Sequence, residues 1–267
     1  MKNRRPKKLP AQRAKKIAKE APLAELRGVG KTFEESVTAL SGVSFSIRHG
    51  EFLSLVGASG CGKTSLLRIV AGLLAPDEGS LLWKAGHRPR ETGFVFQEPA
   101  LMPWASVTDN VRLPLRLLGI GGNEAEMRVE EALELVGLIK FADALPHELS
   151  GGMKMRASLA RALAVKPTLL LMDEPFAALD EISRFKLNDE LLALWQELGC
   201  TVLFVTHSVF EAAYLSTRTL VMSPRPGHIA EEVRFLPATG RFDPQYRTSA
   251  TFNARARKLS EALERAQ

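Results

Sequence analysis

The chain has 267 residues, of which 45% are hydrophobic and 25% charged, an ordinary composition for a globular protein large enough to bury a core. No run approaches the ~18 consecutive apolar residues of a membrane span, and the basic N-terminus lacks the apolar stretch of a secretory signal. The two cysteines, Cys61 and Cys200, indicate a reduced cytosolic protein rather than a disulfide scaffold.

The net charge of +6 comes from the N-terminus. Residues 1–20 hold nine Lys or Arg and one acid, whereas the rest of the chain holds 27 bases and 29 acids. Few apolar residues and three prolines predict a basic disordered tail over residues 1–22. Three interpretations stay open: attraction to anionic lipid headgroups, contact with nucleic acid, or a solvated tail without a function.

The first predicted elements are β-strands at residues 24–33, 39–50 and 51–57, separated by turn residues. A glycine-rich loop then opens a helix at 63–74, and two more strands follow at 76–83 and 92–97. The pattern is helical over residues 110–166, where Asn123 and Glu126 predict a capping box.

The remaining elements alternate again between the two types. Residues 168–175 and 200–208 contain short continuous apolar runs, typical of strands buried on both faces. An amphipathic helix is expected at 184–199, and a turn with a terminal helix at 243–267. Strands that alternate with helices imply an α/β fold with a mostly parallel central sheet.

The segment "GASGCGKT", residues 57–64, fits the pattern G-x-x-x-x-G-K-[ST] without a mismatch. It follows a predicted strand and opens a helix, the context that a phosphate-binding P-loop requires. Its backbone N–H groups and the helix N-terminus favour an anion. Lys63 is expected to reach the β- and γ-phosphates and Thr64 to bind Mg²⁺. Alkylation of Cys61 in this loop is expected to block nucleotide binding.

A second acidic motif is "LLLMDEP", residues 169–175. Asp173 falls at the carboxyl end of a buried strand, where ligands of open α/β sheets bind, and an acid there suits Mg²⁺. Glu174 follows directly and is a candidate general base for an attacking water.

The ordered set of the P-loop, Gln97, "LSGG" (149–152), "MDEP", Asp180 and His207 resembles an ATP-binding cassette, the ATPase subunit of ABC transporters. The resemblance covers about residues 23–235. It implies an N-terminal antiparallel β-subdomain, an ATPase domain over 23–240 with a helical subdomain inserted at about 98–166, and a helical extension at 241–267. In such cassettes, two copies close head to tail around two ATP molecules.

The resemblance also implies roles for single residues. Glu174, His207 and Gln97 would be catalytic, and Thr64, Gln97 and Asp173 would hold Mg²⁺. ATP would be bound by Phe33, Gly57, Ala58, Ser59, Gly60, Cys61, Gly62, Lys63, Thr64, Ser65, Ser150, Gly151, Gly152 and Asp180, with Phe33 stacking on adenine and Ser150 to Gly152 holding the γ-phosphate of the ATP on the partner.

The sequence departs from the commonest family pattern in several places, including Phe33, where the aromatic residue is often Tyr. Met153 and Met155 stand where glutamines are usual, and Ser208 stands where Asp often follows the histidine. Because the phosphate contacts are expected from Ser150 and the glycine backbone, we expect activity to survive these changes.

"LMPW" (101–104), "TDNV", "LSGGM" and "VMSPRPG" (221–227) resemble the importers of nitrate, taurine and sulfonates. The apolar 101–104 segment suits docking of a membrane-subunit helix; in the alternative, Trp104 packs within the helical subdomain.

We therefore expect an ATPase subunit of a bacterial importer that forms a homodimer on the cytoplasmic face of the inner membrane. It would work with two permease subunits and an external solute-binding protein. The alternative is an ABC-type ATPase that acts on nucleic acid, in DNA repair or chromosome structure. The gap between Gln97 and Ser150 is short and has no heptad array, so no nucleic-acid partner is expected.

Overall fold

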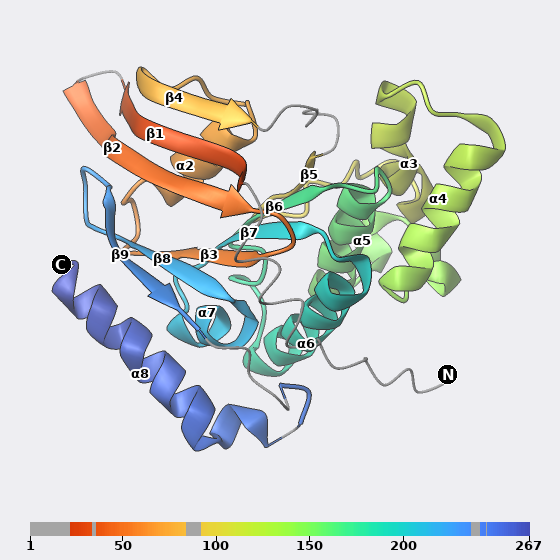
Figure 1. Ribbon diagram of the computed structural model, residues 1–267. Coiled ribbons are helices and arrows are strands. Elements are labelled where there is room, and N and C mark those ends of the chain that lie inside the picture. Colours follow the sequence, from red (N-terminus) through yellow and green to blue (C-terminus); the bar gives the residue numbers. More distant parts are fainter. Residues whose placement is uncertain (1–21, 34–35, 84–91, 236–240, 244) are drawn as a thin grey trace. The chain divides into compact units, whose positions relative to one another are not determined.

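A computed structural model describes residues 22–33, 36–83, 92–235, 241–243 and 245–267 (Figure 1). The basic tail predicted for residues 1–22 lies outside the described residues, except for Pro22, which begins the first strand. The chain divides into two compact units. The first unit comprises residues 1–87 and 195–267, and the second comprises residues 88–194.

An antiparallel sheet of three strands opens the first unit. It consists of β1 (Pro22–Phe33), β2 (Val37–Arg48) and β4 (Glu78–Trp83), in the order β2-β1-β4. Towards the end of β2 the buried side chains of Val43, Phe45 and Ile47 alternate with more exposed serines, the two-residue period of a sheet with one buried face. This is the predicted N-terminal β-subdomain.

The first unit also contains three strands that are buried along their whole length: β3 (Phe52–Val56), β7 (Thr201–Val205) and β8 (Arg218–Met222). β3 pairs in parallel with β7 on one side and with β8 on the other, and β9 (Ile229–Arg234) pairs antiparallel with β8. Burial on both faces explains why these strands are nearly continuous apolar runs in the sequence.

The described residues of the first unit include three whole α-helices: α2 (Lys63–Val70), α7 (Val209–Leu215) and α8 (Ala250–Arg265). α8 follows a short 3₁₀ turn at Tyr246–Thr248 and packs against α7, β8 and β9 (Figure 1). The ring of Phe252 on α8 lies 6.5 Å from Tyr214 and 5.8 Å from Tyr246, measured between centroids. The terminal helix predicted from the sequence is therefore present.

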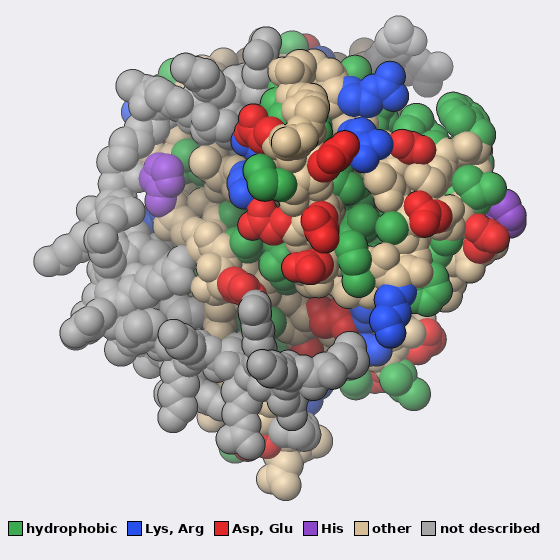
Figure 2. All heavy atoms as spheres, turned by 90° about the vertical axis from the view of Figure 1, so that its right-hand side faces the viewer, with side chains coloured by type: hydrophobic (Ala, Val, Ile, Leu, Met, Phe, Trp, Pro, Cys, Tyr) green, Lys and Arg blue, Asp and Glu red, His purple; other side chains and the backbone are tan. Residues whose placement is uncertain are grey.

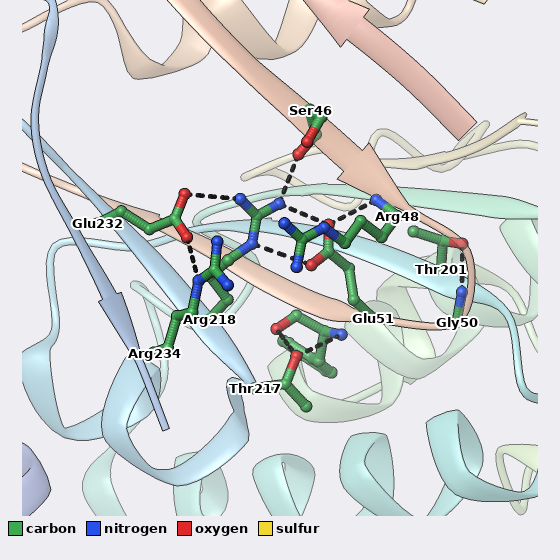
Figure 3. A network of polar contacts seen from close by, with 10 residues as sticks. Ser46, Arg48, Gly50, Glu51, Thr201, Thr217, Arg218, Glu232 and Arg234 are labelled. Carbon is green, nitrogen blue, oxygen red and sulfur yellow. Dashed lines mark hydrogen bonds and ion pairs between the residues drawn. The ribbon is translucent and has the colours of Figure 1, made fainter. Parts of the chain in front are cut away.

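A buried ion network joins the strands of the first unit (Figure 3). The Arg218 guanidinium on β8 contacts the Glu51 carboxylate at 2.8 Å and Glu232 at 2.9 Å, and it donates to the carbonyl of Ser46 on β2. Burial alone would lower the pKa of Arg218, but the hydrogen bonds and charges of Glu51 and Glu232 together outweigh burial and raise it. A buried pair of this kind is costly to break by removing one partner, so it fixes β2 to β3 and β8.

The second unit contains two parallel strands, β5 (Thr92–Val95) and β6 (Leu169–Asp173). The chain between them forms α3 (Val107–Leu117), α4 (Gly122–Leu135), 3₁₀ turns at Ile139–Phe141 and Pro146–Glu148, and α5 (Gly151–Leu163). These three α-helices pack against one another. α6 (Glu181–Leu198) begins in this unit and ends in the first.

Figure 2 shows a face of the protein on which acidic side chains gather. α4 carries five exposed glutamates, Glu124, Glu126, Glu130, Glu131 and Glu134. The predicted capping box at its start is wrong: α4 begins at Gly122 with Gly121 as its N-cap, and no side chain caps it. Within the described ranges, none of the helices is both long and apolar enough to cross a membrane.

Candidate active site

The P-loop connects the carboxyl end of β3 to the first residue of α2 in the first unit. Gly60 and Gly62 have φ angles of 75° and 98°, in the left-handed region that favours glycine. A Cβ atom on Gly62 would lie 2.6 Å from Leu40 Cδ2 and 2.8 Å from the Ala39 carbonyl oxygen. Both backbone conformation and lack of space therefore require glycine at this position.

Lys63 is buried at the centre of this loop. Its ammonium donates to the carbonyls of Gly57 at 3.0 Å and Ala58 at 2.9 Å. Thr64 and Ser65 follow in the first turn of α2 and are half-buried, whereas Ala58, Ser59 and Gly60 are exposed. The loop thus combines a lysine cation with a helix N-terminus at a solvent-accessible surface, an arrangement that binds phosphate.

Cys61 faces the interior of the protein. It is 1% exposed, and its sulfur would lie 2.9 Å from a Cβ atom on Gly57. A bulky reagent has no access to this sulfur in the conformation described, so the structure gives no support to the hypothesis that alkylation of Cys61 blocks nucleotide binding.

Phe33 lies at the end of β1 with 43% of its surface exposed. The Lys31 ammonium lies 5.8 Å from the centroid of the ring and forms an ion pair with Asp77 at 2.7 Å. The Asp77 carboxylate also accepts the Thr32 N–H at 2.8 Å, so it fixes the strand beside the ring. An exposed ring held on a fixed strand is suited to stack on a base, and the stacking of Phe33 on adenine stays a prediction.

His207 is exposed and lies between β7 and α7. The next residue, Ser208, caps α7 by accepting the Glu211 N–H at 3.3 Å. The Thr206 hydroxyl donates to the buried Glu211 carboxylate, so residues on both sides of His207 are held by one glutamate. Ser208, where Asp often stands in the family, therefore serves as a helix cap.

Gln97 lies in the second unit, two residues beyond β5, and is exposed. The segment that follows it is held by Arg161 of α5, whose guanidinium donates to the carbonyls of Pro99 at 2.9 Å and Ala100 at 2.7 Å. Burial lowers the pKa of Arg161. Arg161 is thus an unpredicted residue that ties the helix after "LSGG" to the segment after Gln97.

Asp173 is the last residue of β6 and is 5% exposed. Glu174 follows with a φ of 43°, and its carbonyl accepts the Ala177 N–H at 3.1 Å. A left-handed conformation is uncommon for a residue other than glycine and is concentrated at functional sites. The two carboxylates therefore occupy the end of a rigid strand, as the sequence predicts.

The signature "LSGG" forms the start of α5. Ser150 caps the helix by accepting the Met153 N–H at 3.3 Å. A Cβ atom on Gly152 would meet nothing within 4 Å, and one on Gly151 would lie 3.7 Å from Leu179 Cδ2. Ser150 and Gly151, at the start of this helix, are exposed. Met155 is 5% exposed, so its replacement of a polar residue places an apolar side chain in the interior.

Asp180 precedes α6 and is exposed. Its carboxylate accepts the Ser183 N–H at 2.9 Å, and this hydrogen bond lowers the pKa of Asp180. The residue predicted to organise the dimer interface is thus also the N-cap of α6.

Asn110 on α3 is a further residue that the sequence did not predict. It is fully buried, and its amide nitrogen donates to the carbonyls of Met102, Ala105 and Ser106 while its oxygen accepts the Met102 N–H at 2.7 Å. These bonds shape the turn that presents Trp104, which is 79% exposed. The alternative in which Trp104 packs within the helical subdomain is therefore wrong.

Comparison with known proteins agrees with this geometry. The family model described as "ABC transporter" matches residues 40–177. The taurine import ATP-binding protein of Rhizobium johnstonii is 44% identical over 85% of this chain and 86% of its own length. An uncharacterized ABC transporter ATP-binding protein of Methanocaldococcus jannaschii is 44% identical over 90% of this chain and 91% of its own.

Solved structures give the same result. The dimeric post-hydrolysis state of an ATP-binding cassette bound to ADP and Pi is 34% identical, with a TM-score of 0.69 over 79% of this chain and 98% of that one. The structure of cbiO1 from Clostridium perfringens, part of the ABC transporter complex cbiONQ, has 25% identity and a TM-score of 0.73 over 92% of this chain and 97% of that one.

The fold and the loop at residues 57–64 define a P-loop nucleotide-binding protein. More narrowly, the chain belongs to the ABC transporter family, and it is an ATP-binding cassette, the part that binds and hydrolyses ATP. The predicted family and fold class are confirmed. The alternative function on nucleic acid has no support among these relatives.

Proposed function

We propose that the chain is the ATPase subunit of an importer for small solutes of the nitrate, sulfonate and taurine class. The observation that carries this proposal is the 44% identity to a taurine import ATP-binding protein over 85% of the chain, together with a complete ordered set of cassette motifs. Fold alone does not specify the solute, so the proposal names a class of solute only.

Hydrolysis would depend on positioning and electrostatics. Lys63 and the backbone of the P-loop would hold the phosphates, Glu174 would accept a proton from the attacking water, and His207 would contact the γ-phosphate. Thr64, Asp173 and Gln97 offer the hydroxyl, carboxylate and amide oxygens that Mg²⁺ prefers, so these side chains fit the ion. When bound, Mg²⁺ would neutralise charge on the phosphates.

The site would be completed by a second copy of the chain. The N-terminus of α5 is capped by Ser150 and open at Gly152, so a phosphate held by a partner can approach its N–H groups without a side chain in the way. This openness supports a homodimer in which Ser150, Gly151 and Gly152 contact the ATP of the partner and Asp180 lies at the interface.

The membrane partners would be two permease subunits, supplied with solute by an external binding protein. Trp104 protrudes from a turn fixed by Asn110, a rigid apolar anchor of the kind that dominates protein interfaces. We place the subunit on the cytoplasmic face of the cell membrane, attached through this contact.

The Glu174→Gln variant tests the dimer. Without its general base the protein is expected to retain ATP, so its solution mass should double when Mg-ATP is added, and ATP turnover should fall at least about 100-fold. The matched control is Glu174→Gln combined with Ser150→Arg, which places a bulky side chain at the open helix start and should remain monomeric with ATP bound.

The two variants separate the two parts of the proposal. The dimer model is wrong if both variants bind ATP but stay monomeric, and if two copies of the chain also fail to pair when permease subunits are copurified. A Glu174→Gln chain that keeps wild-type turnover would instead contradict the role of Glu174 as the base.

A further inference from the structure

The turn between β8 and β9, residues 223–228 with the sequence "SPRPGH", lies directly against the P-loop within the first unit. We propose that this β8–β9 turn is a template that holds the P-loop in its phosphate-binding conformation, with Arg225 and Gly227 as positioning residues. The inference rests on ATP binding at the P-loop and adds residues outside that loop to the nucleotide site.

Arg225 makes the first contact of the template. Its guanidinium donates through Nε at 3.2 Å and through Nη2 at 3.0 Å to the carbonyl oxygen of Gly60. In a trans peptide the carbonyl and the following N–H point in opposite directions. Holding this oxygen on the outside of the loop therefore directs the Cys61 N–H to the inside, where it meets the Ala58 carbonyl at 3.3 Å.

Gly227 makes the second contact, with the next peptide unit. A Cβ atom on Gly227 would lie only 2.0 Å from the carbonyl oxygen of Cys61 and 2.7 Å from Met222 Cε. The backbone of Gly227 therefore lies flat against this oxygen, and by the same geometry the Gly62 N–H points to the opposite side. The φ of Gly227 is not in the left-handed region, so the close approach, and not the backbone conformation, requires glycine.

The template is itself held in place from two directions. Ser223 Oγ accepts the His228 N–H at 3.0 Å and lies 2.8 Å from His228 Nδ1, which closes the turn. Gly227 donates its N–H to the Ala39 carbonyl at 2.9 Å and accepts the Ser41 N–H at 3.0 Å. The turn is thus fastened to β2, the strand that also limits the space at Gly62.

Two consecutive peptide planes of the P-loop are therefore oriented by residues outside the loop. The Cys61 N–H closes the loop on Ala58, and the Gly62 N–H is the donor left to face an anion. A donor that is already oriented does not have to be ordered when the anion binds, which increases affinity. The Arg225 side chain also adds a cation beside a loop that binds phosphates, and it is exposed. Both effects act on the affinity for nucleotide phosphates and leave the carboxylate of Glu174 untouched.

The test begins with Arg225→Ala in the full chain. We expect the Kd for Mg-ADP and the KM for Mg-ATP to rise about tenfold, the effect of losing a charge-assisted hydrogen-bond pair, while kcat stays unchanged. Arg225→Lys keeps a cation and one donor and should recover part of the loss. The matched control is Arg257→Ala, which removes an exposed arginine from α8 and should leave both constants as they are.

Hydrogen–deuterium exchange of the nucleotide-free protein supplies the local measurement. In Arg225→Ala, the amides of residues 57–65 should exchange faster, whereas those of α8 should exchange as in the wild type. Gly227→Ala forces the Cys61 carbonyl to move and should weaken Mg-ADP binding more than 10-fold beyond Arg225→Ala. Gly121→Ala, where a Cβ atom would meet nothing within 4 Å, is its control.

The results distinguish failure of the inference from failure of the ATP site. Unchanged affinity in Arg225→Ala would overturn the template, as would weaker binding without faster exchange at residues 57–65, because that pattern reports only the loss of a charge. A wild-type chain that does not bind Mg-ATP or Mg-ADP would overturn the nucleotide site itself.

Discussion

The P-loop and the signature are both glycine-rich stretches at the start of a helix, yet their glycines meet opposite surroundings. Gly62 combines a φ of 98° with neighbours that leave no space for a Cβ atom. Gly152 lies in the first turn of α5, its φ is not in the left-handed region, and a Cβ atom there would meet nothing within 4 Å.

The difference indicates why each motif contains glycine. The fold of the chain itself demands glycine in the P-loop, because the loop is enclosed by β2 and the β8–β9 turn. None of the described residues demands glycine at position 152 by its closeness, and alanine would favour the helix there. A residue that its own fold does not require is explained by something that approaches from outside, which in the proposed dimer would be the phosphate of the ATP on the partner.

The largest difference between the two motifs is expected when Gly62 and Gly152 are each replaced by alanine. Gly62→Ala introduces an unfavourable φ and a steric overlap, and we expect it to destabilise the protein by about 3 kcal/mol and to abolish ATP binding. Gly152→Ala should change stability by less than about 1 kcal/mol, in the stabilising direction. It should nevertheless weaken the ATP-dependent dimer of the Glu174→Gln background. Urea unfolding and solution mass measure the two effects.

A third glycine separates the two destabilising effects expected in Gly62→Ala, which are the unfavourable φ and the steric overlap. Gly42 has a φ of 63°, but a Cβ atom there would meet nothing within 4 Å. Gly42→Ala should therefore show the cost of the left-handed conformation alone, about 1–2 kcal/mol, with normal ATP binding. If Gly152→Ala loses as much stability as Gly62→Ala, the contrast between the two motifs is wrong.

Asn110 and Trp104 test the same contrast between a residue that the fold requires and a residue that serves a partner. Asn110→Ala removes a buried amide and leaves several backbone groups of residues 102–106 without their partner, so a loss of about 3 kcal/mol in unfolding free energy is expected. Trp104→Ala should cost less than about 0.5 kcal/mol, since the side chain is exposed, but it should weaken copurification with permease subunits.

Leu117→Ala is the control for Trp104→Ala, because Leu117 is also 79% exposed but lies at the end of α3, outside the 101–104 segment. Permease subunits should copurify with this variant as with the wild type. Equal loss in both variants would show that general surface hydrophobicity, and not the Trp104 turn, holds the membrane partner.

The sequence predicted those parts of the site whose chemistry is local. The P-loop needs only a strand, a spaced set of glycines, a lysine and a helix, and all of these are contiguous in residues 52–70. The buried strand that ends at Asp173 was equally readable, because burial on both faces leaves an uninterrupted apolar run. Even the positions of Gln97 and His207 after strands followed from the order of the elements.

Residues that act on backbone carbonyls far along the chain could not be predicted in this way. Arg161 holds carbonyls 61 and 62 positions away, and Arg225 holds one 165 positions away, so only the folded chain reveals their partners. The capping box at Asn123 failed for a local reason: the helix begins at Gly122, one residue earlier, and Asn123 lies within its first turn. Capping signals near glycines therefore locate a helix start only approximately.

The smallest expected effect concerns the interior of the signature helix, which is held by its own unit while its start is open. Arg156 on α5 contacts the Glu190 carboxylate of α6 at 2.5 Å. Burial raises the pKa of Glu190 despite the opposing charge of Arg156.

Between the ordinary and the raised pKa of Glu190, the folded protein keeps a proton that the unfolded chain has released. The free energy of unfolding should therefore fall as pH rises through this window. Glu190→Gln should remove this slope, which urea unfolding at successive pH values measures, with a change below about 1 kcal/mol because a third of the side chain is in water. An unchanged slope in Glu190→Gln would show that Arg156 stabilises α5 through its hydrogen bond to the Val136 carbonyl and not through this carboxylate.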